Sequence, residues 1–407
     1  MRLVVVVATL AAVGMPSIAG AQSFPLTESE ALARLSPSSP RVRAIRSSID
    51  VARADVVAAN RWPNPRVTFD REAVAGVTEN MIMVSQALPI TGRRGFDVQS
   101  ATALVDAASV RADEAVKRAR ADLRVAFAQL VSAQVREREL GAALEHLRGL
   151  AEVLSKREAA GDAAGFDRLR AEREVIDIDA DRAAAATERA RAQAAVAGLL
   201  GDTIDPSTIV ALEASEPRPP MPPLSALVEQ AESTRGELAA LRKEIEAARL
   251  SARSADRRRL PEPEVAAGSK SSTAGGGDTG SVITVHATVP LFDRGRPERA
   301  LAEARATQAA ARAEAFQAAL RADISALRAA VVERRDTLER YRSAVSGSAD
   351  IERIAQLSYD AGERGILELL DAYRTGASAR IRQAALATAV RQAEIELEFV
   401  SGWEMPQ

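Results

Sequence analysis

The residue types that carry most catalytic and metal chemistry are scarce in this chain. It contains two histidines, His146 and His286, and no cysteine. A metal site needs several converging ligands, so two isolated histidines are expected to lie on a surface or in a lumen. The lack of cysteine excludes disulfides, thiolate metal sites and a cysteine nucleophile. We therefore predict no metal site and no cofactor.

Motifs of known catalytic chemistry are missing as well. The sequence has no G-x-S-x-G pattern and no P-loop, and Gly275-Gly276-Gly277 is expected to be the tip of a flexible loop. The acidic residues lie among arginines on predicted helix surfaces, so no carboxylate pair can be singled out for acid–base catalysis. The chain is predicted not to be an enzyme.

Length and composition favour an elongated helical protein. Of the 407 residues, 47% are hydrophobic but only 3% are aromatic. An apolar fraction made mostly of alanine and aliphatic side chains is typical of long, closely packed helices. The 54 basic and 56 acidic residues give a net charge of −2, which offers no basic face for nucleic acid.

The first residues resemble an export signal. Arg2 precedes an apolar run from Leu3 to Val13, and Ala19-Gly20-Ala21 fits an A-x-A cleavage site. The apolar run is too short to span about 30 Å of hydrocarbon, and no later segment offers 18 uninterrupted apolar residues. Residues 1–21 are predicted to be a signal peptide, so any membrane insertion must depend on strands.

The rest of the chain is predicted to be a tandem duplication. Three short motifs occur once in each half. Pro63 and Pro65 correspond to Pro261 and Pro263, 198 residues later. Leu88-Pro89-Ile90 corresponds to Val289-Pro290-Leu291, and Ala160-Gly161-Asp162 corresponds to Ala361-Gly362-Glu363, in both cases 201 residues later. The three extra residues fall in Gly268 to Gly280, which is rich in glycine and serine and is predicted to be an exposed loop. We predict repeats at 22–201 and 224–401, a stiff proline-rich linker at 202–223 and a tail at 402–407.

Each repeat is predicted to contain the same elements in the same order. A helix (27–59; 225–257) is followed by two strands (66–74 and 80–88; 264–268 and 281–289), a very long helix (96–159; 297–359) and a second helix (166–200; 366–400). Small residues spaced by threes and fours from Ala101 to Ala133 indicate a coiled coil in which helix backbones approach closely.

The strands raise the question of a membrane. Ile283, Val285, Ala287 and Val289 alternate with Val282, Thr284, His286 and Thr288. This period of two fits a strand between lipid and water, and it fits an edge hairpin of a soluble sheet equally well. Four strands cannot close a barrel, and unpaired strand edges cannot lie in lipid. We therefore expect several chains to share one barrel, which the long helices extend as a tube.

Three segments resemble the TolC family of outer membrane factors, the exit ducts of tripartite efflux and type I secretion systems. They are Ser85 to Arg94, Val289 to Arg296, and Tyr359 to Ala372. The resemblance implies a mainly α fold with membrane β structure, in which a homotrimer forms a twelve-stranded outer membrane β-barrel with four strands per chain. A periplasmic α-barrel of twelve helices continues from it. Gln86 to Arg94 is most similar to the heavy-metal efflux branch (CzcC- and CusC-like).

The resemblance also assigns roles at the periplasmic end of the duct. Counted from Gly362, the constricting acidic pair corresponds to Glu368 and Asp371, whose spacing puts both carboxylates on one helical face. Tyr359 and Arg364 resemble residues that latch the inner helix pair, and Asp167 resembles their acidic partner. The position equivalent to Asp371 in the first repeat is Arg170, so the two halves differ at the tip. An ordinary solvated charged face is the alternative for the acidic pair, and an ordinary intrahelical pair is the alternative for the latch residues.

The predicted function is an outer membrane exit duct that passively conducts substrates such as metal cations or drugs. Its expected partners are a periplasmic adaptor (membrane fusion protein), an inner membrane pump and outer membrane lipid, with no nucleic acid. A type I protein secretion duct is one alternative. A periplasmic coiled-coil adaptor or scaffold is another, although it would carry β-rich segments flanking one hairpin and no duplication.

Overall fold

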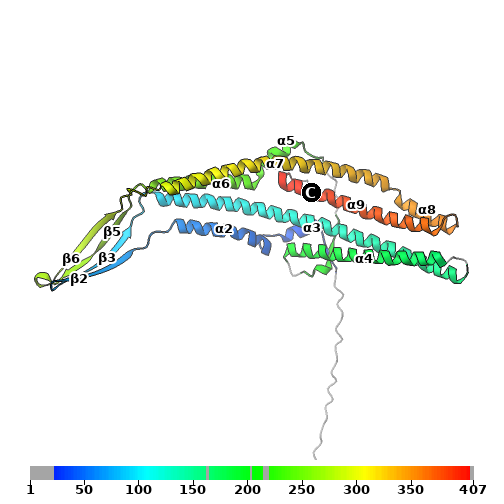
Figure 1. The fold of residues 1–407 in the computed structure, drawn as a ribbon, viewed down its shortest axis with the longest axis horizontal. Coiled ribbons are helices and arrows are strands. Elements are labelled where there is room, and N and C mark those ends of the chain that lie inside the picture. The colour runs from blue at the N-terminus through cyan, green and yellow to red at the C-terminus, as the bar shows by residue number, and fades with distance from the viewer. Residues whose placement is uncertain (1–22, 162–164, 202–203, 214–219, 404–407) are drawn as a thin grey trace, which may run out of the picture.

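The computed structural model describes residues 23–161, 165–201, 204–213 and 220–403. The predicted signal peptide, parts of the predicted linker and the last four residues lie outside this range. The molecule is elongated, with a β-sheet at one end and the turns of two long helical hairpins at the other (Figure 1). The mostly helical fold with four long strands agrees with the sequence-based prediction.

The first half begins with a short strand and ends with a pair of long helices. Its elements are β1 (Phe24–Leu26), α1 (Glu28–Arg34), α2 (Pro40–Ala59), β2 (Arg66–Val74), β3 (Val77–Ala87), α3 (Arg93–Ala159) and α4 (Gly165–Leu200). The 67 residues of α3 correspond to a helix about 100 Å long.

The second half repeats this order with one helix divided in two. Its elements are β4 (Ile209–Ala211), which follows the 3-10 turn η1 (Pro206–Thr208), α5 (Leu224–Thr234), α6 (Gly236–Arg257), β5 (Pro263–Ser272), β6 (Asp278–Ala287), α7 (Arg296–Val345), α8 (Ser348–Asp360) and α9 (Ile366–Ser401).

The four long strands form one antiparallel sheet in the order β2-β3-β5-β6. Each half contributes one hairpin, and β3 pairs with β5 where the two hairpins meet. The turn of the first hairpin has two residues, Ala75 and Gly76, and both have positive φ, as a tight hairpin turn requires. The turn of the second hairpin has five residues, 273–277. The three extra residues of the second half therefore lie in this turn.

The predicted loop from Gly268 to Gly280 is wrong over most of its length. Strand β5 continues to Ser272, β6 starts at Asp278, and only a short 3-10 turn, η2 (Ala274–Gly276), lies between them. Glycine and serine have low β-propensity, but pairing with β3 overrides that preference. Gly268 is needed there because a Cβ atom would lie 1.9 Å from the carbonyl oxygen of Ile82.

The helix α3 is the centre of the helical layer. Near the strands it packs between α2 and α6, and α7 packs on the far side of α6. Near the hairpin turns it packs between α4 and α9, and α9 in turn contacts α7 and α8 (Figure 1). The layer therefore ends at α2 and α4 on one side and at α7 and α8 on the other.

Three predicted helices are interrupted in the structure. The helix predicted at 27–59 breaks before Pro40, which starts α2 and is preceded by the capping residue Ser39. The helix predicted at 225–257 breaks at Arg235, where the backbone N–H of Gly236 donates to Glu114 Oε2 at 2.6 Å. The helix predicted at 297–359 breaks around Gly347, because glycine between serines is a weak helix former.

The described part of the predicted linker, 204–213 and 220–223, contains a 3-10 turn and a short strand. Strand β4 of this linker pairs in parallel with β1, so the segment that precedes the second half is joined to the start of the first half. The side-chain amide of Gln134 on α3 accepts from the Ala211 N–H at 2.8 Å and donates to the Ala211 carbonyl at 2.9 Å. Leu26 and Ile209 are buried with Leu123 and Leu130 of α3. None of the described helices combines the length and apolarity needed to cross a membrane.

Candidate functional site

The sheet has one apolar and one polar face. Directly paired residues of adjacent antiparallel strands point to the same side, so the register assigns every side chain to a face. One face, called here the apolar face, carries Val67, Phe69, Ile82, Val84, Val265, Ala267, Ile283 and Val285. The opposite face carries Arg66, Thr68, Asp70, Glu72, Ser85, Glu79, Glu264, Lys270, Thr284 and His286 together with Met81 and Met83. The predicted alternation of β6 is confirmed.

The apolar face is not covered by any other part of the described chain. Phe69 is 65% exposed, Ile283 is 76% exposed and Val285 is 68% exposed. Strands β2 and β6 are the outer strands, so one edge of each has no backbone partner among the described residues. The strands contain 9, 11, 10 and 10 residues, which matches the 9–11 residues of a tilted membrane-spanning strand.

The helical layer also exposes apolar side chains along both of its outer edges. On one edge these are Val51 and Val57 of α2 and Phe166, Leu169 and Ile176 of α4. On the other they are Leu301 of α7 and Ile351, Ile354 and Leu357 of α8. Spacings of three and seven put the α4 residues on one face of that helix, as do the spacings of three in α8. Both edges can therefore pack against further helices.

The acidic pair predicted at the gate lies at the far end from the sheet. Glu368 is the third residue of α9 and Asp371 follows one turn later; both are exposed. Their neighbours Leu369 and Leu370 are buried in the core that joins α3, α4, α8 and α9. The core fixes the helix so that the two carboxylates point away from it. A carboxylate at the start of a helix is also favoured by the helix dipole.

Two of the three predicted latch residues lie close together. The nearby charge of Asp167 on α4 raises the pKa of the Tyr359 hydroxyl, although burial is the larger cause. The guanidinium of Arg157 lies over the Tyr359 ring, 5.8 Å from its centroid, and opposes this shift. The side chain of Arg364 is exposed and has no ion pair among the described residues. In this structure the Tyr359 ring is therefore contacted by Arg157 of α3, and no ring contact joins it to Arg364 within the described chain.

The two halves differ at the tip in the way the sequence indicates. Asp167 occupies the position equivalent to Glu368, whereas Arg170 is equivalent to Asp371 and is exposed. No group of three or more His, Cys, Asp or Glu side chains within the described part of the chain could hold a metal ion.

A polar network that the sequence did not reveal connects three helices of the hairpins. Arg380 on α9 bonds Glu139 of α3 at 2.6 Å and Glu352 of α8 at 2.8 Å. Two turns away along α9, the Tyr373 hydroxyl donates to Gln356 at 2.7 Å, and its ring stacks on His146 with 5.3 Å between centroids. These residues come from distant parts of the sequence, so only the packing of the hairpins identifies them.

A second charged cluster ties α1 to the middle of α3 and α9. Arg124 bonds Glu28 at 2.7 Å and Glu398 at 2.5 Å, and Arg391 bonds Glu28 at 2.9 Å. Burial raises the pKa of the Glu398 carboxyl, and the charge and hydrogen bond of Arg124 oppose that shift. This cluster is half-buried and far from both ends, so we assign it to stability.

Comparisons with known proteins agree with this geometry. Residues 227–402 match the family model described as outer membrane efflux protein. No curated protein is significantly similar in sequence. A membrane protein from Pseudomonas aeruginosa has a similar structure, with a TM-score of 0.75 and 20% identity over 92% of this chain and 93% of that chain.

Two further solved structures cover nearly the whole chain. The CmeC outer membrane channel of Campylobacter jejuni has a TM-score of 0.77 and 13% identity over 99% of this chain and 94% of that chain. CusC has a TM-score of 0.71 and 15% identity over 93% of this chain and 92% of that chain. Because the sequence identities are so low, these structural similarities establish the fold alone.

Proposed function

We propose, from the membership of residues 227–402 in the outer membrane efflux protein family, that this chain is the outer membrane exit duct of a tripartite efflux system. The observation that carries the proposal is the sheet, whose apolar face is exposed and whose strands have membrane-spanning length. An isolated sheet of this kind would leave apolar side chains in water and strand edges unpaired. Insertion in a bilayer as part of a closed barrel removes both costs.

The barrel requires three copies of the chain. Three sheets of four strands, joined edge to edge, would give twelve strands, an even number within the range of bacterial outer membrane barrels. In the same closed ring, α2 and α4 of one copy would meet α7 and α8 of the next. The apolar side chains on both outer edges of the helical layer support this contact. The helices would then form a periplasmic tunnel.

The far end of the tunnel would face the periplasmic adaptor and the inner membrane pump. In a trimer, Glu368 and Asp371 would form two stacked rings of negative charge that attract cations. Tyr359, Asp167 and Arg157 would join adjacent helices near the turns and hold the tip closed. Arg364 remains a proposed latch residue, acting only after the tip rearranges.

The compound that is transported is determined by the pump and the adaptor, and the fold of the duct does not identify it. Metal cations, drugs and, for a type I secretion duct, proteins are the three candidates. CusC, which belongs to the heavy-metal branch proposed from Gln86 to Arg94, is less similar to this chain, in both TM-score and identity, than the membrane protein from Pseudomonas aeruginosa is. A soluble adaptor or scaffold gains no support, because it has no use for an exposed apolar sheet face.

The two faces of the sheet allow a matched test. Ile283→Lys puts a charge on the apolar face, whereas Val282→Lys puts it one residue away on the opposite face. A basic residue on the lipid face of a barrel costs about 2–4 kcal/mol at the bilayer midplane. We expect the Ile283 variant to be lost from outer membranes and the Val282 variant to be retained. Equal amounts of both variants in that fraction would argue against a membrane sheet.

A gene deletion then identifies the cargo. Cells lacking the chain should accumulate the transported compound, measured separately for a divalent metal, a cationic dye and a secreted protein. Restoration by the wild type and by Val282→Lys, but not by Ile283→Lys, would link transport to the membrane sheet. Normal levels of all three in the deletion strain would contradict the efflux function.

A further inference from the structure

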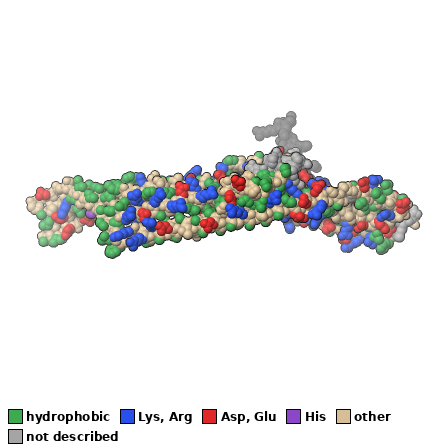
Figure 2. All heavy atoms as spheres, turned by 90° about the horizontal axis from the view of Figure 1, so that it is seen from above, with side chains coloured by type: hydrophobic (Ala, Val, Ile, Leu, Met, Phe, Trp, Pro, Cys, Tyr) green, Lys and Arg blue, Asp and Glu red, His purple; other side chains and the backbone are tan. Residues whose placement is uncertain are grey.

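Arginines gather where the sheet joins the helices. Helices α2 and α6 end there and α3 and α7 begin there, and the basic side chains lie on the helices close to the strands (Figure 2). Six of them have no carboxylate within 4.0 Å among the described residues, and we call them the arginine layer: Arg61, Arg94, Arg257, Arg259, Arg294 and Arg296. The described segments contain no lysine at this level.

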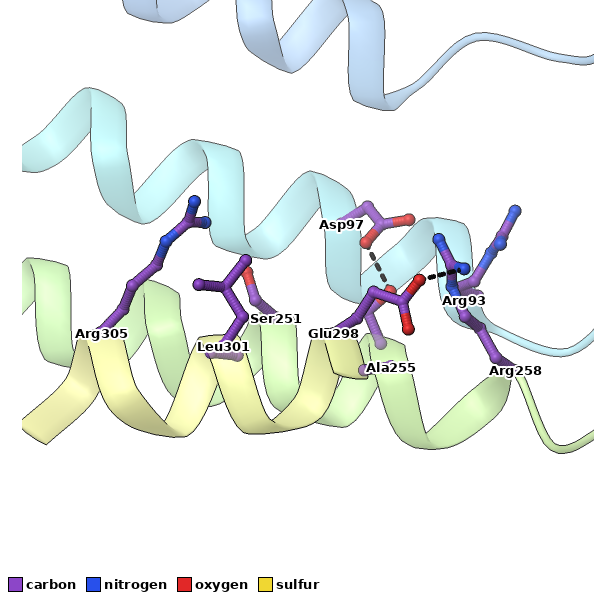
Figure 3. A pocket seen from close by; sticks show the side chains of 10 residues that line it. Arg93, Asp97, Ser251, Ala255, Arg258, Glu298, Leu301 and Arg305 are labelled. Atoms are coloured by element: carbon purple, nitrogen blue, oxygen red, sulfur yellow. Dashed lines mark hydrogen bonds and ion pairs between the residues drawn. The ribbon is translucent and has the colours of Figure 1, made fainter. Parts of the chain in front are cut away.

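Three acidic side chains at the same level have basic partners outside the arginine layer. Arg258 bonds Glu298 at 2.5 Å and lies 4.0 Å from Asp293, and Arg93 lies 3.8 Å from Glu262. Arg93, Arg258 and Glu298 line an open cavity of about 330 Å³ between α3, α6 and α7, where Asp97 accepts from Ser254 (Figure 3). These three acids are therefore paired with Arg93 and Arg258, and no described carboxylate lies within 4.0 Å of the six arginines of the layer.

Apolar and aromatic side chains accompany this charge. The Arg94 guanidinium lies 5.0 Å from the centroid of the Trp62 ring and donates to the Asn60 carbonyl at 3.0 Å. Trp62 is 56% exposed, and Phe292, between the strand and helix of the second half, is 97% exposed. Tryptophan beside a basic residue is characteristic of the boundary between hydrocarbon and headgroups.

We propose that the arginine layer binds the phosphate groups of anionic phospholipids in the membrane leaflet on the helical side. This inference rests on the proposed function, because it needs the apolar face of the sheet to lie in the hydrocarbon. The layer continues from that face directly into the first turns of the helices, which is the depth of the headgroups. The six layer arginines have no described carboxylate within 4.0 Å, so their charge is available to an anionic headgroup, whereas a headgroup without net charge gains less from it.

The layer should make the protein select anionic lipid. An arginine near an anionic membrane surface strengthens binding about fivefold. Removing two arginines should therefore lower the preference for anionic over neutral lipid by up to about 25-fold. The guanidinium also keeps its charge at any physiological pH, so the preference should not change between pH 6 and 8.

Tryptophan fluorescence can measure this preference. The chain has two tryptophans, and Trp403→Phe leaves Trp62 as the probe in the arginine layer. The full-length protein is reconstituted in vesicles of brominated phosphatidylglycerol or brominated phosphatidylcholine mixed with the unlabelled neutral lipid. Bromine quenches tryptophan on contact, so the ratio of the two quenching curves gives the relative affinity at the layer. The ratio is taken within each variant, which cancels changes in the intrinsic fluorescence of Trp62.

The test compares Arg61→Gln/Arg94→Gln with a control pair, Arg312→Gln/Arg342→Gln. The control arginines lie on α7 away from the strands, are exposed and have no carboxylate partner in the described chain. We expect stronger quenching by phosphatidylglycerol in the parent and in the control pair, and loss of this preference in the layer variant. Equal quenching by both lipids in the parent, or a preference that survives in the layer variant, would overturn the inference.

A second probe separates this inference from the proposed function. Phe69→Trp, with Trp62 and Trp403 both replaced by phenylalanine, reports on the apolar face of the sheet. Quenching at position 69 together with equal quenching of Trp62 by both lipids would refute the arginine layer and leave the membrane sheet intact. No quenching at position 69 would refute the membrane sheet, and the lipid site with it.

Discussion

Replacing Arg157 with alanine should make the closed duct open more often. Its guanidinium lies 5.8 Å from the centroid of the Tyr359 ring, and it counters the negative charge of Asp167 next to that ring. Without it, α8 loses a contact with α3, on which Arg157 lies, and the effect of the Asp167 charge on Tyr359 is no longer opposed. The core beneath, which includes Leu369 and Leu370, is unchanged, so the hairpins should still fold.

The magnitude follows from the contact. A cation over an aromatic ring at a partly exposed site contributes about 0.5–1 kcal/mol. About 1 kcal/mol per chain shifts the ratio of open to closed tips roughly fivefold, and a trimer that opens in one step would multiply three such factors to about a hundredfold. Planar-bilayer recordings should show this as a higher open probability with unchanged conductance of the open state. Cells should become more sensitive to large antibiotics that the outer membrane normally excludes.

Arg364→Ala is the matched comparison. It removes the same charge at the same end of the molecule, in the turn between α8 and α9, but its side chain has no ion pair in the described structure. We expect a smaller increase in open probability than for Arg157→Ala. If Arg364→Ala opened the duct and Arg157→Ala did not, the contact with Tyr359 would not be the latch, and Arg364 would act as the resemblance implies.

Three further results are expected. Glu368→Ser/Asp371→Ser should raise conductance and weaken block by divalent cations, and unchanged block in bilayer recordings would remove the two residues from the constriction. Gly295→Ala should lower stability by at least about 2 kcal/mol, because φ is 75° there and the new Cβ would lie 2.2 Å from the Ala255 carbonyl oxygen. Gly149→Ala, which faces open space in α3, should instead stabilise by about 0.5–1 kcal/mol; equal thermal unfolding midpoints would contradict this. Because burial raises the pKa of Glu398, the folded state binds a proton more readily than the unfolded state, and this site gains stability as the pH falls through the folded-state pKa. Glu398→Gln should remove that gain, and an unchanged pH dependence of the unfolding midpoint would exclude Glu398 as its source.

The strands and long helices could be predicted because their patterns are local. Strand β2 has the predicted bounds, and the three-residue change of offset between the halves anticipated a longer turn in the second hairpin. Alternation in β6 identified its apolar face from side-chain type alone. The alternation of apolar residues is a property of one segment, and the offset is a property of two copies of that segment. Both can therefore be read from the sequence without knowing how the helices pack.

Contacts between helices could not be predicted in this way. Arg157 and Tyr359 are about two hundred residues apart, and nothing near Arg157 distinguishes it from other arginines on helix surfaces. The same is true of Arg380, which meets Glu139 and Glu352 only because α3, α8 and α9 pack together. Gly268 was placed in a loop for its composition, whereas its role depends on the close approach of β3. Each of these errors concerns a partner that lies far away in the sequence.

The central claim is that three chains share one barrel in the outer membrane. The measurement that tests it most directly is the detergent-corrected mass, by light scattering, of the native particle extracted gently from purified outer membranes. The account predicts a particle of three chains in that fraction. A monomer recovered from the soluble periplasm would contradict it, because the apolar face would then not lie in lipid and the edges of the sheet would not be paired in a barrel.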